Sequence, residues 1–216
     1  MTMLAINNYS KAYNKDHFAV SGLSLNVDSG DLFAFIGHNG AGKSTTIKSI
    51  VGILPFDDGD ILIDGISIKK DPIACKKMIA YIPDNPDIYD SLTGIQYLNF
   101  IADIFKVDKT TRKAIIDKYA SEFELTNDLN NLISSYSHGM KQKVAMIASL
   151  IHEPKLWILD EPLTGLDIIT VKELIDYMKD YREKGNSIFL TSHNIDIVEK
   201  ICDRVVFIHK GKILNT

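Results

Sequence analysis

A glycine-rich segment at residues 37–44 combines residue types that can bind phosphate groups. It reads Gly-His-Asn-Gly-Ala-Gly-Lys-Ser and follows the apolar run 32–36, which is typical of a strand buried on both faces. Residues 43–51 are expected to form a helix. Glycines let backbone N–H groups approach phosphate oxygens, and the positive end of the helix points at them. Lys43 would supply charge to the β- and γ-phosphates, and the Ser44 hydroxyl would be a ligand for Mg²⁺.

This spacing matches the nucleotide-binding pattern G-x-x-x-x-G-K-[ST], called a P-loop, and a strand and a helix flank it as that motif requires. A chance glycine-rich turn is the alternative, which these flanking elements disfavour. We therefore predict that the chain binds ATP. The residues predicted to contact the nucleotide here are Gly37, His38, Asn39, Gly40, Ala41, Gly42, Lys43, Ser44 and Thr45.

Two acidic residues, Asp160 and Glu161, directly follow a second apolar run at residues 156–159. Ligands of open α/β sheets gather at the carboxyl ends of the strands. Two acids at such a place are costly unless a cation or hydrogen-bonded water compensates them. Asp160 fits an outer-shell role towards Mg²⁺, and Glu161 fits a general base that polarises the attacking water. A solvated acidic turn is the alternative for this pair taken alone.

His193 follows a further apolar strand, residues 188–191. At the carboxyl end of that strand its imidazole could reach the γ-phosphate of a bound nucleotide. A single histidine is more often structural, so its assignment needs support from outside this pattern.

The pattern along the chain predicts an α/β fold. The first ~85 residues indicate strands and short turns, including the alternating segment 23–27. From about residue 91 to 135 apolar residues recur at helical spacing and glycine is nearly absent, which indicates an inserted helical lobe. Strands and helices then alternate again, which favours a mainly parallel sheet flanked by helices.

Composition restricts the partners and the compartment. The net charge is −4 and the pI is about 5.8, so we expect no nucleic acid partner. Cys75 and Cys202 stand far apart and outside metal-ligand spacing, which favours reduced thiols in a cytosolic protein. We see neither a signal peptide nor an apolar run near the ~20 residues that span a bilayer. Any membrane role is therefore expected to come through a partner.

The order of these motifs resembles that of the ATP-binding cassette (ABC) ATPases, from the first strand to the last. Residues 160–162 resemble the Walker B motif, and residues 163–167 resemble the D-loop. The resemblance implies that Asp167, in this D-loop, contacts the nucleotide. His193 is similar to the switch histidine of the family. Tyr13, expected in the turn after the first strand, stands at the place of the aromatic residue that stacks on adenine. Ordinary packing is an equal alternative for Tyr13.

Residues 136–143, Tyr-Ser-His-Gly-Met-Lys-Gln-Lys, resemble the family signature, usually Leu-Ser-Gly-Gly-Gln. The resemblance implies that this loop binds the ATP held by an opposite subunit. Ser137 and the Gly139 N–H at a helix N-terminus would make an anion site, and Ser137 also fits an N-cap. Two residues depart from the pattern, His138 at the first glycine and Met140 at the glutamine.

Asp84 stands where the family normally has a glutamine that meets Mg²⁺ and the attacking water. A carboxylate there could bind Mg²⁺ more strongly, or it could add negative charge near the γ-phosphate. The sequence leaves both effects open.

The resemblance implies a P-loop NTPase fold with an N-terminal antiparallel β part. One nucleotide-binding domain is expected over the whole chain. Its boundaries would be 1–90 and 155–216 for the α/β core and about 91–152 for the helical lobe, which ends in the signature helix.

The function implied is an ATP-hydrolysing subunit that dimerises on ATP with a second copy of itself or a related subunit. It would power a separate polytopic membrane permease from the cytoplasmic face of the membrane. Segments 83–86 and 136–142 resemble those of bacterial exporters, and residues 87–91, with Tyr89, would dock on the permease. A soluble ATP-driven clamp or switch is the alternative. A regulatory subunit without turnover is disfavoured by Glu161 and His193.

Overall fold

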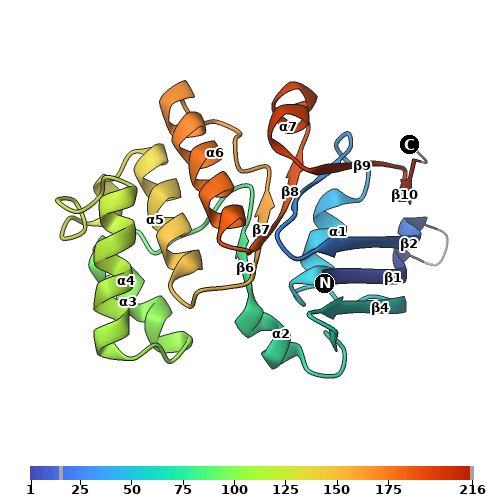
Figure 1. Ribbon diagram of the computed structural model, residues 1–216, viewed down its shortest axis with the longest axis horizontal. Helices are drawn as coiled ribbons and strands as arrows, with labels where there is room; N and C mark the ends of the chain where they lie inside the picture. Colours follow the sequence, from blue (N-terminus) through green and yellow to red (C-terminus); the bar gives the residue numbers. More distant parts are fainter. Residues whose placement is uncertain (15–16, 215–216) are drawn as a thin grey trace.

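Two β-sheets organise the computed structural model, which describes residues 1–14 and 17–214 (Figure 1). One sheet is antiparallel, and its order is β2-β1-β4-β5. Its strands are β1 (Thr2–Asn14), β2 (His17–Asp28), β4 (Asp58–Ile63) and β5 (Ile66–Ser67). This sheet is the N-terminal antiparallel part that the resemblance implied.

The second sheet has the order β10-β9-β3-β8-β7-β6 and is parallel except for β10. Its strands are β3 (Leu32–Ile36), β6 (Ile79–Ile82), β7 (Leu156–Asp160), β8 (Ser187–Ser192), β9 (Arg204–His209) and β10 (Lys212–Ile213). Every residue of β3, β7 and β8 is buried. The prediction of a mainly parallel sheet built from continuous apolar runs is confirmed.

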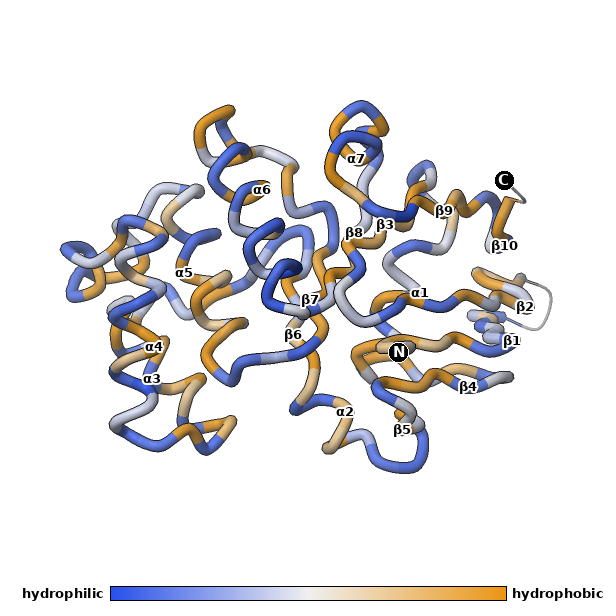
Figure 2. Tube along the Cα trace, in the orientation of Figure 1, coloured by the Kyte–Doolittle hydropathy of each residue, from blue (hydrophilic) through white to orange (hydrophobic). Residues whose placement is uncertain are grey.

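The central sheet separates two apolar clusters because successive side chains of a strand point to opposite faces. Leu32 and Ala34 of β3 belong to the cluster that includes buried helix residues between positions 98 and 201 on one face. Phe33 and Phe35 belong to the cluster that includes the antiparallel sheet on the other face. In Figure 2 the strands of this sheet are mostly orange, the colour of apolar residues. Both faces of the sheet are therefore covered, which fixes the strands firmly in place.

The helices are α1 (Lys43–Ile50), α2 (Pro72–Met78), α3 (Gly94–Ile104), α4 (Lys109–Glu122), α5 (His138–Leu150), α6 (Ile168–Glu183) and α7 (Ile195–Ile201), with a 3₁₀ turn at Ile133–Ser135. Helices α3, α4 and α5 form one end of the molecule, and β1, β2 and β4 form the other (Figure 1). Within residues 1–14 and 17–214, no helix has both the length and the apolar character that a membrane crossing requires.

Helix α2 corrects the prediction that the first ~85 residues, beyond the helix after the P-loop, are strands and turns. Asp71 caps this helix, since its carboxylate accepts from the Ala74 N–H at 2.9 Å. Pro72 occupies the first helical position, where its missing N–H costs nothing. Lys76 and Lys77 lie in the last turn, where cations favour the helix dipole. These signals were present in the sequence.

Parallel pairing brings the carboxyl ends of three strands to one edge of the sheet. Ile36 pairs with Ser192, and Asp160 pairs with Thr191. The segments that follow these strands, beginning at Gly37, Glu161 and His193, must therefore start side by side. Three motifs that are far apart in the sequence meet here because of strand register alone.

Candidate functional site

The predicted strand–loop–helix arrangement of the P-loop is confirmed, because β3 ends at Ile36 and α1 begins at Lys43. Two glycines are required by the backbone of this loop. Gly42 has φ of 113°, and a Cβ there would lie 2.9 Å from the Ala19 carbonyl oxygen. A Cβ on Gly37 would lie 2.5 Å from the Ile208 carbonyl oxygen. The loop is therefore held close to its neighbours at Gly37 and Gly42.

A cavity of about 640 Å³ opens in front of this loop, within the usual size of ligand sites. Eleven of the predicted site residues line it: Tyr13, His38, Asn39, Gly40, Gly42, Lys43, Ser44, Thr45, Asp84, Asp160 and Glu161. Gly37 and Ala41 belong to the framework of the loop. Ser137, Gly139 and Asp167 line a different pocket.

Lys43 lines this cavity with a buried ammonium. The side chain is only 6% exposed, and its Nζ donates to the Gly37 carbonyl at 2.6 Å. Glu161 Oε1 lies 3.2 Å from the same Nζ. A buried ammonium needs such partners, and it would be a strong point charge for phosphate oxygens in the same place.

Thr191 forms hydrogen bonds to both acidic residues. It was not predicted from the sequence. Its hydroxyl donates to Asp160 Oδ1 at 2.6 Å and accepts from the Glu161 N–H at 3.0 Å. Thr191 is fully buried, and Asp160 is 5% exposed. Only strand register could have revealed it, because Thr191 stands opposite Asp160 on β8.

Glu161 is held in an uncommon backbone conformation, with φ of 51°. Such a conformation costs a non-glycine residue roughly 1 kcal/mol or more. It directs the carboxylate between Lys43 and His193. Oε2 accepts from the His193 N–H at 3.2 Å and lies 2.9 Å from Nδ1 of its imidazole. Oε1 is buried, and its partner is the charge of Lys43, because no donor among the described residues meets it in hydrogen-bond geometry.

The donors expected for Mg²⁺ gather in the same cavity. Ser44, Asp84 and Asp160 all line it, and each offers an oxygen, the ligand type that Mg²⁺ prefers. Burial raises the pKa of the nearby Tyr81 to about 12, and the charges of Asp160 and Asp84 add to the effect. With Glu161 the cavity is lined by three carboxylates, the buried ammonium of Lys43 and the exposed Lys210. Among the described residues no three acidic, histidine or cysteine side chains lie close enough together to hold a metal ion, so a Mg²⁺ here would need further oxygen ligands from phosphate or water.

Tyr13 lies in β1 rather than in the turn after it, which corrects the prediction of its place. Strand β1 is longer than expected and continues to Asn14. The ring is 58% exposed, and its hydroxyl lies 3.3 Å from Thr45 Oγ1, directly after the P-loop. Phe18 of β2, 51% exposed, lines the same cavity and was not singled out from the sequence. Stacking of Tyr13 on a base stays a prediction.

The signature residues line a second pocket, of about 520 Å³. Ser137 caps α5, because its hydroxyl accepts from the Met140 N–H at 3.2 Å. Asp167 caps α6, and the hydrogen bond from the Thr170 hydroxyl lowers the pKa of its carboxyl group, as do the N–H groups of Ile169 and Thr170. A Cβ on Gly139 would meet open space. Among the described residues, none that lines this pocket also lines the P-loop cavity.

A P-loop after a buried parallel strand, with an acidic pair at the carboxyl end of the next strand but one in the same sheet, defines a P-loop nucleoside triphosphatase. A family model described as "ABC transporter" matches residues 20–164. The chain therefore belongs to the ABC transporter family, as an ATP-binding subunit with ATPase activity.

Relatives support the same assignment over almost the whole chain. An uncharacterised ABC transporter ATP-binding protein, YhcH of Bacillus subtilis (strain 168), is 35% identical over 99% of this chain and 69% of its own. The SkfA peptide export ATP-binding protein SkfE of the same organism is 34% identical over 100% of this chain and 89% of its own. A solved structure titled "Structure of ATP binding subunit of ABC transporter" is 33% identical, with a TM-score of 0.91 over 98% of this chain and 88% of that one.

Gly42→Ala is expected to weaken ATP binding more than tenfold, because the added Cβ would strain the loop and press on the Ala19 carbonyl. Gly139→Ala is the matched control, since its Cβ meets open space. Titration with a fluorescent ATP analogue measures both affinities in the monomer. Equal affinities for the two variants would contradict the role assigned to the Gly42 backbone.

Proposed function

We propose that this subunit hydrolyses ATP as a head-to-tail dimer and drives a separate membrane permease. One observation carries the dimer: the P-loop cavity and the signature pocket share no lining residue among those described. The signature of one copy therefore does not complete the site of the same copy. A second copy turned by two-fold symmetry would bring its Ser137–Gly139 segment to the first copy's P-loop, and the reverse. Each ATP would then lie between two subunits.

Lys43 and Glu161 would exchange partners when ATP binds. The Lys43 ammonium now faces Glu161 Oε1 at 3.2 Å, and it would turn to the β- and γ-phosphates. Glu161 Oε1 would then be free to accept a proton from the attacking water. His193, 2.9 Å from Oε2, would keep the carboxylate in this orientation.

Ser44, Asp84 and Asp160 would hold Mg²⁺, whose charge would offset that of the phosphates. The remaining catalysis would come from placement of the γ-phosphoryl group between Lys43 of one copy and the α5 N-terminus of the other. Ser137 and the Gly139 N–H at that N-terminus suit an anion. Closure of the dimer would require ATP, and hydrolysis would allow the dimer to open again.

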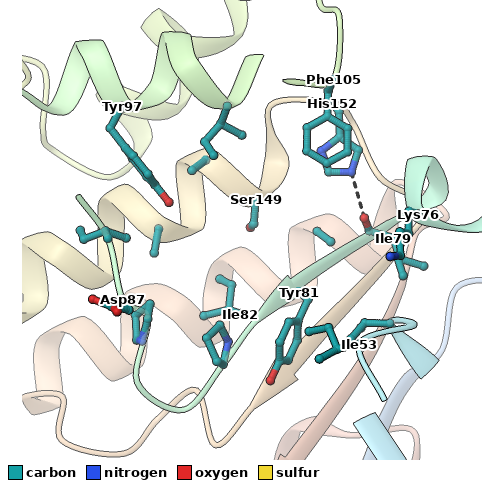
Figure 3. A pocket seen from close by; sticks show the side chains of 18 residues that line it. Ile53, Lys76, Ile79, Tyr81, Ile82, Asp87, Tyr97, Phe105, Ser149 and His152 are labelled. Carbon is teal, nitrogen blue, oxygen red and sulfur yellow. Dashed lines mark hydrogen bonds between the residues drawn. The ribbon is translucent and has the colours of Figure 1, made fainter. Parts of the chain in front are cut away.

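A groove of about 350 Å³ supports docking of a permease segment. It lies between β6 on one side and α3 and α5 on the other (Figure 3). His152 stacks on Phe105 with ring centroids 3.7 Å apart, and burial lowers the pKa of its imidazole. Most of the other side chains that line the groove are apolar. Tyr89, 57% exposed, lies two residues beyond Asp87 at the groove's end.

An apolar segment on the cytoplasmic side of a polytopic membrane protein fits this groove, and it would place the subunit at the inner face of the membrane. The relative SkfE is named an export protein, which supports export as the direction. A soluble ATP-driven clamp or switch remains the alternative function. Capture of a membrane protein distinguishes the two.

Glu161→Gln is expected to retain ATP binding, to slow hydrolysis at least a hundredfold and to accumulate an ATP-bound dimer, because the amide cannot take a proton. Single-turnover hydrolysis and sedimentation with and without ATP measure these effects. Asp176→Asn, which neutralises a carboxylate outside the site on α6, is the control. Normal hydrolysis by Glu161→Gln would exclude Glu161 as the base.

Mixing two inactive variants tests the shared site. Lys43→Ala keeps an intact signature, and Ser137→Arg keeps an intact P-loop. In a head-to-tail dimer the mixture forms one complete site, so activity should rise at least tenfold above that of either variant alone. A phosphate-release assay during titration of one variant into the other measures the ATPase rate of the mixture. A strictly additive rate would rule out a site shared between copies.

The permease should be recovered with the subunit from detergent extracts of the source cells. Tyr89→Ser is expected to reduce the recovered polytopic membrane protein at least fivefold, because it removes an exposed apolar contact at the groove's end. Ile195→Ser, which alters an exposed apolar residue on α7, serves as the control. Recovery of no membrane protein with the unaltered subunit would favour the soluble clamp.

A further inference from the structure

Asp90 holds the chain on both sides of the signature serine. Its backbone carbonyl accepts from the Ser134 N–H at 3.1 Å. Its carboxylate accepts from Lys141 Nζ at 2.7 Å. Ser134 precedes Ser137 in the sequence, and Lys141 follows it on α5. A single residue outside the signature therefore contacts both flanks of Ser137.

Backbone contacts extend this attachment on the side that precedes Ser137. The Ile133 N–H donates to the Leu92 carbonyl at 2.9 Å, and the Gly94 N–H donates to the Asn131 carbonyl at 3.2 Å. A Cβ on Gly94 would lie 2.5 Å from the hydroxyl oxygen of Tyr136, the residue directly before Ser137. Residues 89–94 and the signature loop are thus joined by hydrogen bonds and close packing.

The same short segment packs against a residue of the groove wall. Tyr89, next to Asp90, is 57% exposed, and its ring packs on Phe100 and Tyr97 of α3 with centroids 5.7 and 6.2 Å apart. Tyr97 lines the groove in Figure 3. The loop with Pro83 and Pro86 joins this unit to β6. A partner seated in the groove would therefore contact Ile88 and Tyr97, the neighbours of Tyr89 in sequence and in packing, while Asp90 contacts the signature.

We propose that Asp90 is a positioning residue that transmits the placement of the Tyr89 segment to Ser137 through its ion pair with Lys141. The proposal rests on the proposed function, in which Ser137 completes the ATP site of the opposite copy. The backbone bonds fix only the flank before Ser137. The ion pair also attaches α5, on the other flank of Ser137, to residues 89–94. The position of the α5 N-terminus therefore depends on the position of this segment.

Asp90 is 56% exposed and Lys141 is 29% exposed in their side chains, so solvent screens the pair. An exposed ion pair changes an equilibrium by about two- to fivefold. A symmetric dimer contains two such pairs, and both act on the same association. Loss of the pair is therefore expected to weaken ATP-dependent dimerisation by about tenfold, while the affinity of the monomer for ATP stays unchanged.

The experiment uses Asp90→Ala and Lys141→Gln, each in the Glu161→Gln background. Sedimentation with Mg-ATP measures the dimer dissociation constant, and a fluorescent ATP analogue measures monomer binding. Asp117→Ala is the matched control, because it removes an ion pair with Lys113 on α4 of the same lobe. The exchanged pair Asp90→Lys with Lys141→Asp should recover most of the lost dimerisation.

Weaker dimerisation with unchanged monomer affinity and recovery by the exchanged pair support the proposal. The proposal is overturned if Asp90→Ala and Lys141→Gln both have the same dimer dissociation constant as Asp117→Ala. That result would leave the proposed function intact. Failure of Glu161→Gln itself to dimerise on ATP overturns the proposed function and this inference together. A lower unfolding temperature together with weaker ATP binding by the monomer would mean a general structural defect and would also overturn it.

Discussion

Burial of the central parallel sheet on both faces is the constraint on which the site depends. Strands β3, β7 and β8 have no exposed residue, so their register is fixed by packing rather than by turns. Parallel strands end at the same edge, and the polar segments that follow must share that edge. The P-loop, the acidic pair and His193 come together for this reason. A slip of one residue in β7 would turn Asp160 away from Thr191.

The charges of the cavity are balanced only in part by the protein. Three carboxylates, of Asp84, Asp160 and Glu161, line it together with the buried ammonium of Lys43 and the exposed ammonium of Lys210. Hydrogen bonds from Thr191 and His193 stabilise two of these acids, and Glu161 Oε1, which no described donor meets in hydrogen-bond geometry, faces the Lys43 ammonium at 3.2 Å. A ligand that drew Lys43 away would leave Oε1 without a partner among the described residues, next to a strained backbone.

Local patterns gave the part of the site that is continuous in the sequence. Residues 37–44 carry their own turn, charge and helix signal, and residues 160–161 follow an apolar run, so both could be predicted. Phe18, Thr191 and the Asp90–Lys141 pair could not, because each depends on strand pairing or on contacts between distant segments. Helix α2 differs from these. Its cap and its first-turn proline are local signals, so residues 71–77 are sufficient to predict it.

The neighbours of β3 in the sheet have a consequence for biosynthesis. This strand leads into the P-loop near the start of the chain, yet it pairs with β8 and β9, which lie near the end of it. As the ribosome releases the chain, β3 has no partner until those last strands emerge. The antiparallel sheet and the helices α3 to α5 can form earlier from local contacts. The nucleotide cavity is thus the last part of the molecule to assemble, and an apolar strand must be protected from aggregation until then.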